Sequence, residues 1–223
     1  MDQTASSVGD AVAIDFKDPA NPIVRSINAN LTGLGLALCI IDCGADHAAL
    51  TNEYASIPEE MSKVAAHFGK KVLREVKEED LLADLAQVRK EAGDRAVLRA
   101  LHFYADDRRA AEEADALERK DKEAFLNLVK ESGRSSWELL QNCYTMKDFH
   151  EQKITRTLAL TQLFLKKIGA GVCRVHGGGF AGVIAAIVPE KEQDNYVEYI
   201  SRFVGKENVY PMDIRAIGAV HIG

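Results

Sequence analysis

Three consecutive glycines between two apolar segments are the residues of this chain best suited to chemistry. The stretch RVHGGGFAG covers residues 174–182 and spaces Gly177, Gly179 and Gly182 in the pattern GxGxxG. Glycine reaches positive φ at little cost and lets an anionic group approach the backbone N–H groups closely. The segment therefore predicts either a cradle for an anion such as a phosphate or a tight hairpin between two core strands.

The context of these glycines excludes two common nucleotide-binding motifs. A dinucleotide-binding fingerprint opens a helix early in a βαβ unit, whereas VIAAIVP at 183–189 is short, rich in β-branched residues and ended by Pro189. Too few residues follow to complete that fold. A P-loop requires Lys-Ser or Lys-Thr directly after its glycines, and neither is present here.

Apolar segments of strand length flank the glycines and recur elsewhere. VCRVH (172–176) and VIAAIV (183–188) enclose the loop, and LALCIID (36–42) is the continuous apolar pattern of a strand covered on both faces. AVAIDF (11–16) predicts another strand, closed by the turn KDPANP, and a last strand is expected near 209–221. Together these segments predict a small, largely antiparallel sheet.

Helical periodicity dominates the middle of the chain. Apolar residues recur at helical spacing from about Ala48 to His67, with Pro58 a break or first-turn position inside this stretch. Asp121 is expected to cap the start of one helix and Gly169 the end of another. The expected helices cover residues 48–67, 78–91, 94–118, 121–132, 149–168 and 190–204. The fold class is therefore α+β, with helices packed on the small sheet.

The composition of the chain limits which ligands it can bind and in which cellular compartment it is expected. The 223 residues carry 28 basic and 34 acidic side chains, a net charge of −6, without a long block of either sign, so nucleic acid is not expected as a principal ligand. Cys39 and Cys173 lie in apolar runs and are predicted to be reduced core residues. The N-terminus does not resemble a signal peptide, and no apolar stretch has the length of a membrane span. These features favour a cytoplasmic protein that does not bind membranes.

The glycine loop and several other segments resemble GHMP kinases, and galactokinases in particular. HGGGFAG followed by an apolar strand resembles the third conserved motif of that family, in which most galactokinases carry GGGFGG where this chain has Ala181. ESGRSS (131–136) and VLRALHF (97–103) resemble galactokinase segments at similar positions. MDQTASSVGDAVAID resembles an internal segment, GIMDQ and its following strand. The resemblance covers essentially the whole chain and implies the C-terminal half of a galactokinase.

The resemblance implies roles for individual residues. It places Asp2 on the catalytic aspartate, which takes or orients the proton of the sugar C1 hydroxyl, and Tyr54 on a tyrosine that packs against the sugar. The phosphate loop comprises Gly177, Gly178, Gly179 and Gly182, and no residue is assigned to a metal. The implied cofactors are ATP and Mg²⁺, and the implied substrate is galactose or a related sugar.

The resemblance also predicts how the chain is organised. Residues 1–35 are expected to be a remnant of the GHMP N-terminal domain that carries the catalytic aspartate, and residues 36–223 to form the GHMP C-terminal domain. Segments resembling GRVNLIGEHTDYNGG and the GLSSSA-type nucleotide loop have no counterpart in the sequence. Because these segments would supply most sugar contacts and the nucleotide cradle, we expect a truncated protein that is inactive alone.

Two alternatives and one assembly state remain to be tested. The chain could be a non-catalytic sugar-sensing or dimerising module derived from a galactokinase, or part of another GHMP sugar kinase. Loss of half of a two-domain fold exposes apolar surface, which a separate N-terminal half or a second copy would cover. A homo-oligomer is therefore expected, with the strand at 11–16 as the first candidate for pairing between chains.

Overall fold

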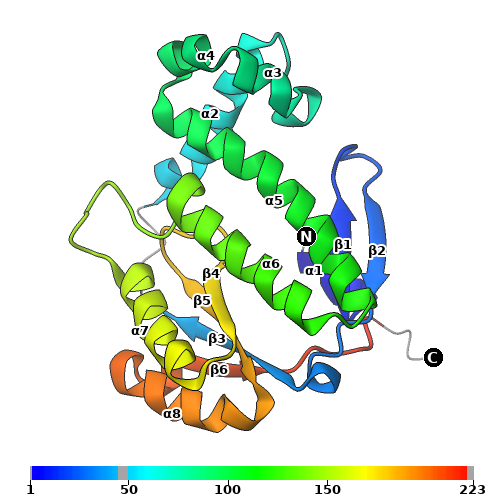
Figure 1. Ribbon diagram of the computed structural model, residues 1–223, viewed down its shortest axis with the longest axis vertical. Helices are drawn as coiled ribbons and strands as arrows, with labels where there is room; N and C mark the ends of the chain where they lie inside the picture. The colour runs from blue at the N-terminus through cyan, green and yellow to red at the C-terminus, as the bar shows by residue number, and fades with distance from the viewer. Residues whose placement is uncertain (1, 45–49, 220–223) are drawn as a thin grey trace.

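The central element of the fold is a four-stranded antiparallel sheet. The computed structural model describes residues 2–44 and 50–219, with the side chains of residues 2 and 3 outside the description. The sheet has the order β4-β5-β3-β6 (Figure 1), formed by β4 (Val172–His176), β5 (Val183–Pro189), β3 (Leu36–Asp42) and β6 (Val209–Met212). The small antiparallel sheet predicted from the sequence is confirmed, although its last strand ends at Met212 rather than near residue 221.

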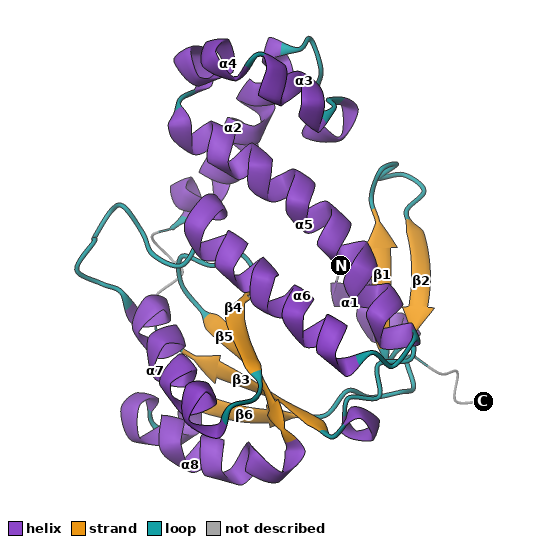
Figure 2. Cartoon of the chain, in the orientation of Figure 1, coloured by secondary structure: helices purple, strands orange, loops and turns teal. Residues whose placement is uncertain are grey.

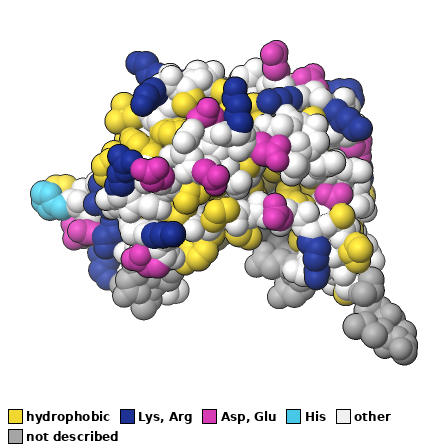
Figure 3. Space-filling view, turned by 90° about the horizontal axis from the view of Figure 1, so that it is seen from below, with side chains coloured by type: hydrophobic (Ala, Val, Ile, Leu, Met, Phe, Trp, Pro, Cys, Tyr) yellow, Lys and Arg dark blue, Asp and Glu magenta, His cyan; other side chains and the backbone are white. Residues whose placement is uncertain are grey.

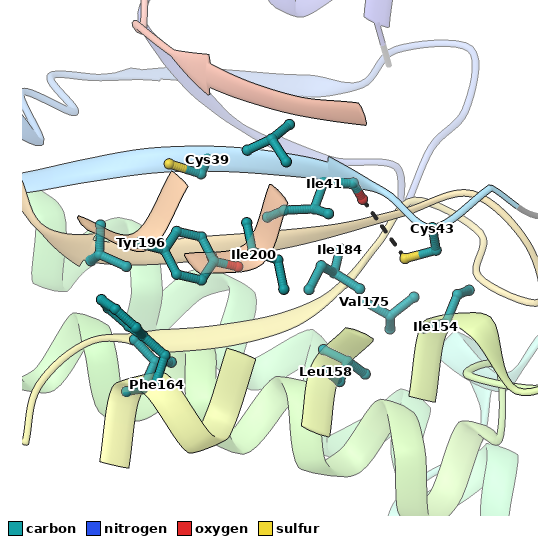
Figure 4. Packing of buried hydrophobic residues seen from close by; sticks show 14 of the residues in the cluster. Cys39, Ile41, Cys43, Ile154, Leu158, Phe164, Val175, Ile184, Tyr196 and Ile200 are labelled. Atoms are coloured by element: carbon teal, nitrogen blue, oxygen red, sulfur yellow. Dashed lines mark hydrogen bonds between the residues drawn. The ribbon is translucent and has the colours of Figure 1, made fainter. Parts of the chain in front are cut away.

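One face of the sheet is covered by α7 (Lys153–Ile168) and α8 (Gln193–Val204). In the register of the sheet Cys39 lies opposite Ala186, and alternate residues along β3 and β5 point into this core (Figure 4). Gly169 ends α7 with φ 70°, as its position predicted. Cys39 is fully buried and Cys173 half-buried, and the four cysteines are free thiols.

The opposite face is covered in part by α6 (Lys122–Ser135), which lies beside α5 (Asp94–Glu118) as Figure 2 shows. Phe125 and Val129 of α6 pack with Val172 and Ile187 of the sheet. Asp121 caps α6 by accepting a hydrogen bond from the backbone N–H of Ala124 at 3.0 Å. A π-helix, Ser136–Leu140, continues directly from α6 and leads into the loop before α7.

A helical lobe stands at the end of α5 that is farther from the hairpin. It consists of α2 (Thr51–His67), α3 (Glu78–Ala83) and α4 (Leu85–Ala92), packed around Val64, Leu81 and Val88. The break considered at Pro58 does not occur, since α2 is continuous and buries Val64 beyond the proline. The prediction of one helix over 78–91 is wrong, because Asp84 leaves helical geometry and separates α3 from α4. The carboxylate of Asp84 lies 2.8 Å from His67 Nε2.

The N-terminal segment forms a separate hairpin against α5. α1 (Asp2–Val8) precedes β1 (Ala11–Asp15), which pairs antiparallel with β2 (Ile23–Ile27). Arg25 fixes this hairpin by donating to Asp115 of α5 at 2.8 Å. The sequence predicted β1 and its turn but neither α1 nor β2. The residues of β2 are mostly exposed and lack the alternation of apolar and polar residues that marks a half-buried strand. None of the described helices is long and apolar enough to cross a membrane.

Candidate functional site

The glycine-rich segment forms the loop between the antiparallel strands β4 and β5, so it is a hairpin loop with an unusual backbone. Gly177, Gly179 and Gly182 have φ values of 74°, 78° and 101°, and Phe180 also has a positive φ of 55°. Ala181 is buried and has ordinary φ, which explains why a methyl group is tolerated there. The sequence pattern therefore marks real conformational requirements of this loop.

Two exposed backbone N–H groups of this loop have no acceptor among the described residues. Gly177 and Gly178 are exposed, and within the described residues their backbone N–H groups donate to no other group. The backbone alternates between left-handed and ordinary φ from Gly177 to Gly179. Adjacent N–H groups in such an alternation form a concave anion-binding surface. The loop thus has the geometry of a small anion cradle.

Tyr54, on the first turn of α2, holds the loop from one side. Its hydroxyl donates to the carbonyl of Gly179 at 2.9 Å, and its ring meets Phe180 edge-on with centroids 5.6 Å apart. A Cβ on Gly178 would lie 2.7 Å from Cε1 of the Tyr54 ring, so the ring and this glycine are in close contact. Burial raises the pKa of Tyr54, which keeps its hydroxyl protonated as a donor.

Asn142 holds the loop from the other side. Its carbonyl accepts the N–H of Phe180 at 2.5 Å, and its Nδ2 donates to the carbonyl of Gly178 at 3.2 Å. The preceding residue, Gln141, has φ 58° and ends the π-helix. Asn142 is 3% exposed, and its Oδ1 has no hydrogen-bond partner in the part of the chain that the structure describes. Asn142 could not be identified from the sequence, because no local spacing links it to the glycines.

A buried arginine joins the two supports of the loop. Arg99 of α5 is 1% exposed and donates to Glu60 Oε2 and Ser56 Oγ of α2, each at 2.9 Å. It also donates to the carbonyl of Leu140 at 3.2 Å, two residues before Asn142. Burial lowers the pKa of Arg99, while Glu60 opposes that shift. One side chain therefore fixes both the helix that carries Tyr54 and the segment that carries Asn142.

The two flanking segments singled out in the sequence also meet in space. His102, in VLRALHF, has Nδ1 2.9 Å from Ser135 Oγ, in ESGRSS. Ser132 donates to Asp106 at 2.6 Å and accepts from Arg174 of β4 at 2.6 Å. Burial lowers the pKa of His102. This polar network joins α5 and α6 to β4, the strand that leads into the glycine loop.

The predicted site residues are only partly brought together by the structure. Tyr54 contacts the loop that contains Gly177, Gly178, Gly179 and Gly182. Asp2 begins α1, but its side chain lies outside the described residues. Within those residues no group of three His, Cys, Asp or Glu side chains could hold a metal ion. The free loop N–H groups fit a phosphate, whereas the described side chains offer no comparable fit for Mg²⁺.

Comparison with known sequences links the chain to galactokinases. No protein-family model matches it. It is 30% identical to galactokinase from Actinobacillus pleuropneumoniae serotype 3 over 207 residues, which are 92% of this chain and 49% of that protein. It is 30% identical to the Homo sapiens galactokinase over 225 residues, 98% of this chain and 52% of the relative. The chain spans about half the length of the curated relatives it matches.

Comparison with solved structures supports the fold assignment. Lactococcus lactis galactokinase complexed with galactose matches 95% of this chain and 52% of its own, with a TM-score of 0.69 and 16% identity. L. major mevalonate kinase in complex with R-mevalonate matches 98% of this chain and 53% of its own, with a TM-score of 0.56 and 11% identity. The GHMP-kinase fold predicted from the sequence is confirmed.

Proposed function

We propose that this chain, which is related to galactokinases, provides the C-terminal half of a site that transfers the γ-phosphoryl group of ATP to the C1 hydroxyl of galactose. The observation that carries the proposal is the pair of free N–H groups at Gly177 and Gly178, in a loop of the galactokinase type clamped by Tyr54. Phosphoryl transfer depends mainly on positioning and charge stabilisation, which a rigid anion cradle supplies.

The proposed chemistry assigns one role to each part of the site. Asp2 takes or orients the proton of the sugar C1 hydroxyl. The oxygen of that hydroxyl attacks the γ-phosphorus of ATP, and the bond between this phosphorus and the leaving ADP breaks. The N–H groups of Gly177 and Gly178 stabilise charge on the transferred phosphate. The half-buried ring of Tyr54 packs against the sugar, while its hydroxyl remains bound to the loop. ATP supplies the phosphoryl group when it is bound.

The proposed organisation has two parts. Residues 1–35 belong to the N-terminal domain of the GHMP fold, and residues 36–223 form the C-terminal domain. This division is supported by the pairing of β1 with β2 in a sheet of their own, distinct from the four-stranded sheet that includes β3. Arg25 and Asp115 link the two parts through an ion pair at the surface.

We further propose that these 223 residues do not phosphorylate galactose by themselves. The sequence contains no counterpart of the segments that in galactokinases bind the nucleotide phosphates and most of the sugar. Fixing two reactants in line can contribute about 7 to 11 kcal/mol to catalysis. A polypeptide that cannot align ATP with the sugar forgoes most of that contribution, so its turnover is expected at background.

A coupled ADP-release assay tests the catalytic part of the proposal. The 223 residues alone should give no galactose-dependent ADP. Joined to the N-terminal half of human galactokinase, they should give galactose-dependent ADP that Asp2→Asn abolishes. Turnover by the 223 residues alone would contradict the requirement for the second half. Full activity of the Asp2→Asn variant in the joined protein would contradict the role of Asp2.

A binding measurement tests the loop without relying on turnover. Amide resonances of the 223-residue chain are followed by NMR during titration with ATP and, as a control, with adenosine. The resonances of Gly177 and Gly178 should shift saturably with ATP and stay in place with adenosine, because the loop recognises phosphate. Equal shifts with both ligands, or no shift at these two glycines, would refute the phosphate-binding role.

A further inference from the structure

A groove of about 510 Å³ runs between α7 and α8, and its lining shares no residue with the clamp around the glycine loop. Phe164 and Tyr199 line it with their rings centred 5.2 Å apart, and Phe203 contacts Tyr199 from outside the lining, with ring centroids also 5.2 Å apart. The Tyr199 hydroxyl donates to the carbonyl of Leu160 at 3.1 Å, which ties α8 to α7. The groove is therefore a preformed feature held by contacts between the two helices.

Apolar side chains in and beside this groove are exposed to solvent. Leu163 on α7 lines the groove and is 62% exposed, and Phe203, next to the groove on α8, is 47% exposed. Figure 3 views the molecule from below and shows groups of exposed hydrophobic side chains with charged side chains among and around them. Exposed apolar side chains grouped beside charged ones are typical of protein–protein interfaces.

The two walls of the groove carry opposite charge. α7 contains four basic residues, among them Lys166 and Lys167, and no acidic residue. The segment 190–204, which includes α8, contains four acidic and two basic residues, with Glu192 on the groove. Arg202, one of these basic residues, is paired with Glu198 within the same helix. The α7 wall is thus positive and the α8 wall negative on balance.

We propose that the α7–α8 groove is a homodimer interface, occupied by the same groove of a second copy. A twofold axis brings α7 of each copy against α8 of the other, so a surface with one positive and one negative wall complements itself. In this arrangement Leu163 of one copy enters the aromatic groove of the other, and Lys167 lies opposite Glu192. The pairing leaves the glycine loop and the β1–β2 hairpin free.

Light scattering after gel filtration tests this interface. The wild-type chain should have twice the 24.5 kDa mass of the monomer. Leu163→Glu should weaken the dimer at least about 30-fold, since charge in the centre of an interface acts on its most sensitive positions. Leu82→Glu is the matched control, because Leu82 is 52% exposed on α3, away from the groove, and this variant should remain dimeric. Unchanged circular dichroism establishes that both variants are folded.

Charge reversal tests the orientation of the two copies. Lys167→Glu and Glu192→Lys should each weaken the dimer, and the double variant should restore it because the exchanged charges attract again. A monomeric wild type at high micromolar concentration would overturn the proposal. A dimer that survives Leu163→Glu would assign self-association to another surface, such as the β1–β2 hairpin. Failure of the double variant to recover would overturn the proposed pairing of walls.

Discussion

Replacing Gly179 by alanine should destabilise the protein far more than the same replacement at Gly177. The two glycines have similar φ values, 78° and 74°. A Cβ on Gly179 would lie 2.2 Å from the carbonyl oxygen of Asn142 and 2.6 Å from its Nδ2, whereas a Cβ on Gly177 would meet no heavy atom within 4 Å. The two variants therefore share the backbone cost and differ in the collision with Asn142.

The expected magnitudes follow from these contacts. Left-handed φ costs alanine about 1 to 2 kcal/mol, which is the whole effect expected at Gly177. At Gly179, displacing Asn142 adds about 1 to 3 kcal/mol of overpacking. Loss of its hydrogen bond with Phe180 adds about 1 kcal/mol more. Gly179→Ala should thus lower the free energy of unfolding by about 3 to 6 kcal/mol, at least about 2 kcal/mol beyond Gly177→Ala.

Thermal unfolding measures the difference. Trp137, the single tryptophan of the chain, lies in the π-helix five residues before Asn142, so its fluorescence reports on this support of the loop. The melting temperature of the Gly179→Ala variant should be lower than that of the Gly177→Ala variant by at least about 4 to 8 °C. Circular dichroism provides an independent record of global unfolding. Equal melting temperatures for the two variants would refute the idea that Asn142 fixes the loop at Gly179.

Three further predictions concern the supports of the loop. Tyr54→Phe removes the donor to the loop carbonyl and should lower the free energy of unfolding by about 1 kcal/mol in urea titrations; an unchanged value would contradict this contact. Arg99→Met removes the donor to the Leu140 carbonyl, to Ser56 and to partly buried Glu60, which keeps its ion pair with Arg95, and should cost about 1 to 3 kcal/mol. Exposed Arg134→Met should cost under about 0.5 kcal/mol, and similar losses for the two variants would argue against a buried network. Burial lowers the pKa of His102 in the folded state, so the unfolded chain binds a proton first, and stability should fall as the pH drops below about 6.5. His102→Gln should show a shallower fall over that range in unfolding experiments at stepped pH, and an identical pH profile would contradict the assignment.

Local patterns predicted much of the secondary structure. The helix at 94–118 and the strand at 36–42 have the predicted bounds, because their apolar residues recur with a regular period. Asp121 and Gly169 cap their helices as expected, since capping depends on side-chain chemistry and φ at one position. Pro58 shows the limit of such rules, because packing of α2 against α5 maintains a helix that the proline alone disfavours.

The sequence by itself determined the α+β class, the glycine loop and the relationship to galactokinases, because each rests on neighbouring residues or short motifs. Only the tertiary structure decided what surrounds the loop. Tyr54 reaches Gly179 across 125 positions of sequence, and Asn142 reaches Gly178 across 36. Such contacts depend on how α2, the π-helix and β4 pack, and no local period records that packing. The buried Arg99 that fixes both supports is likewise visible only once α5 is folded against α2.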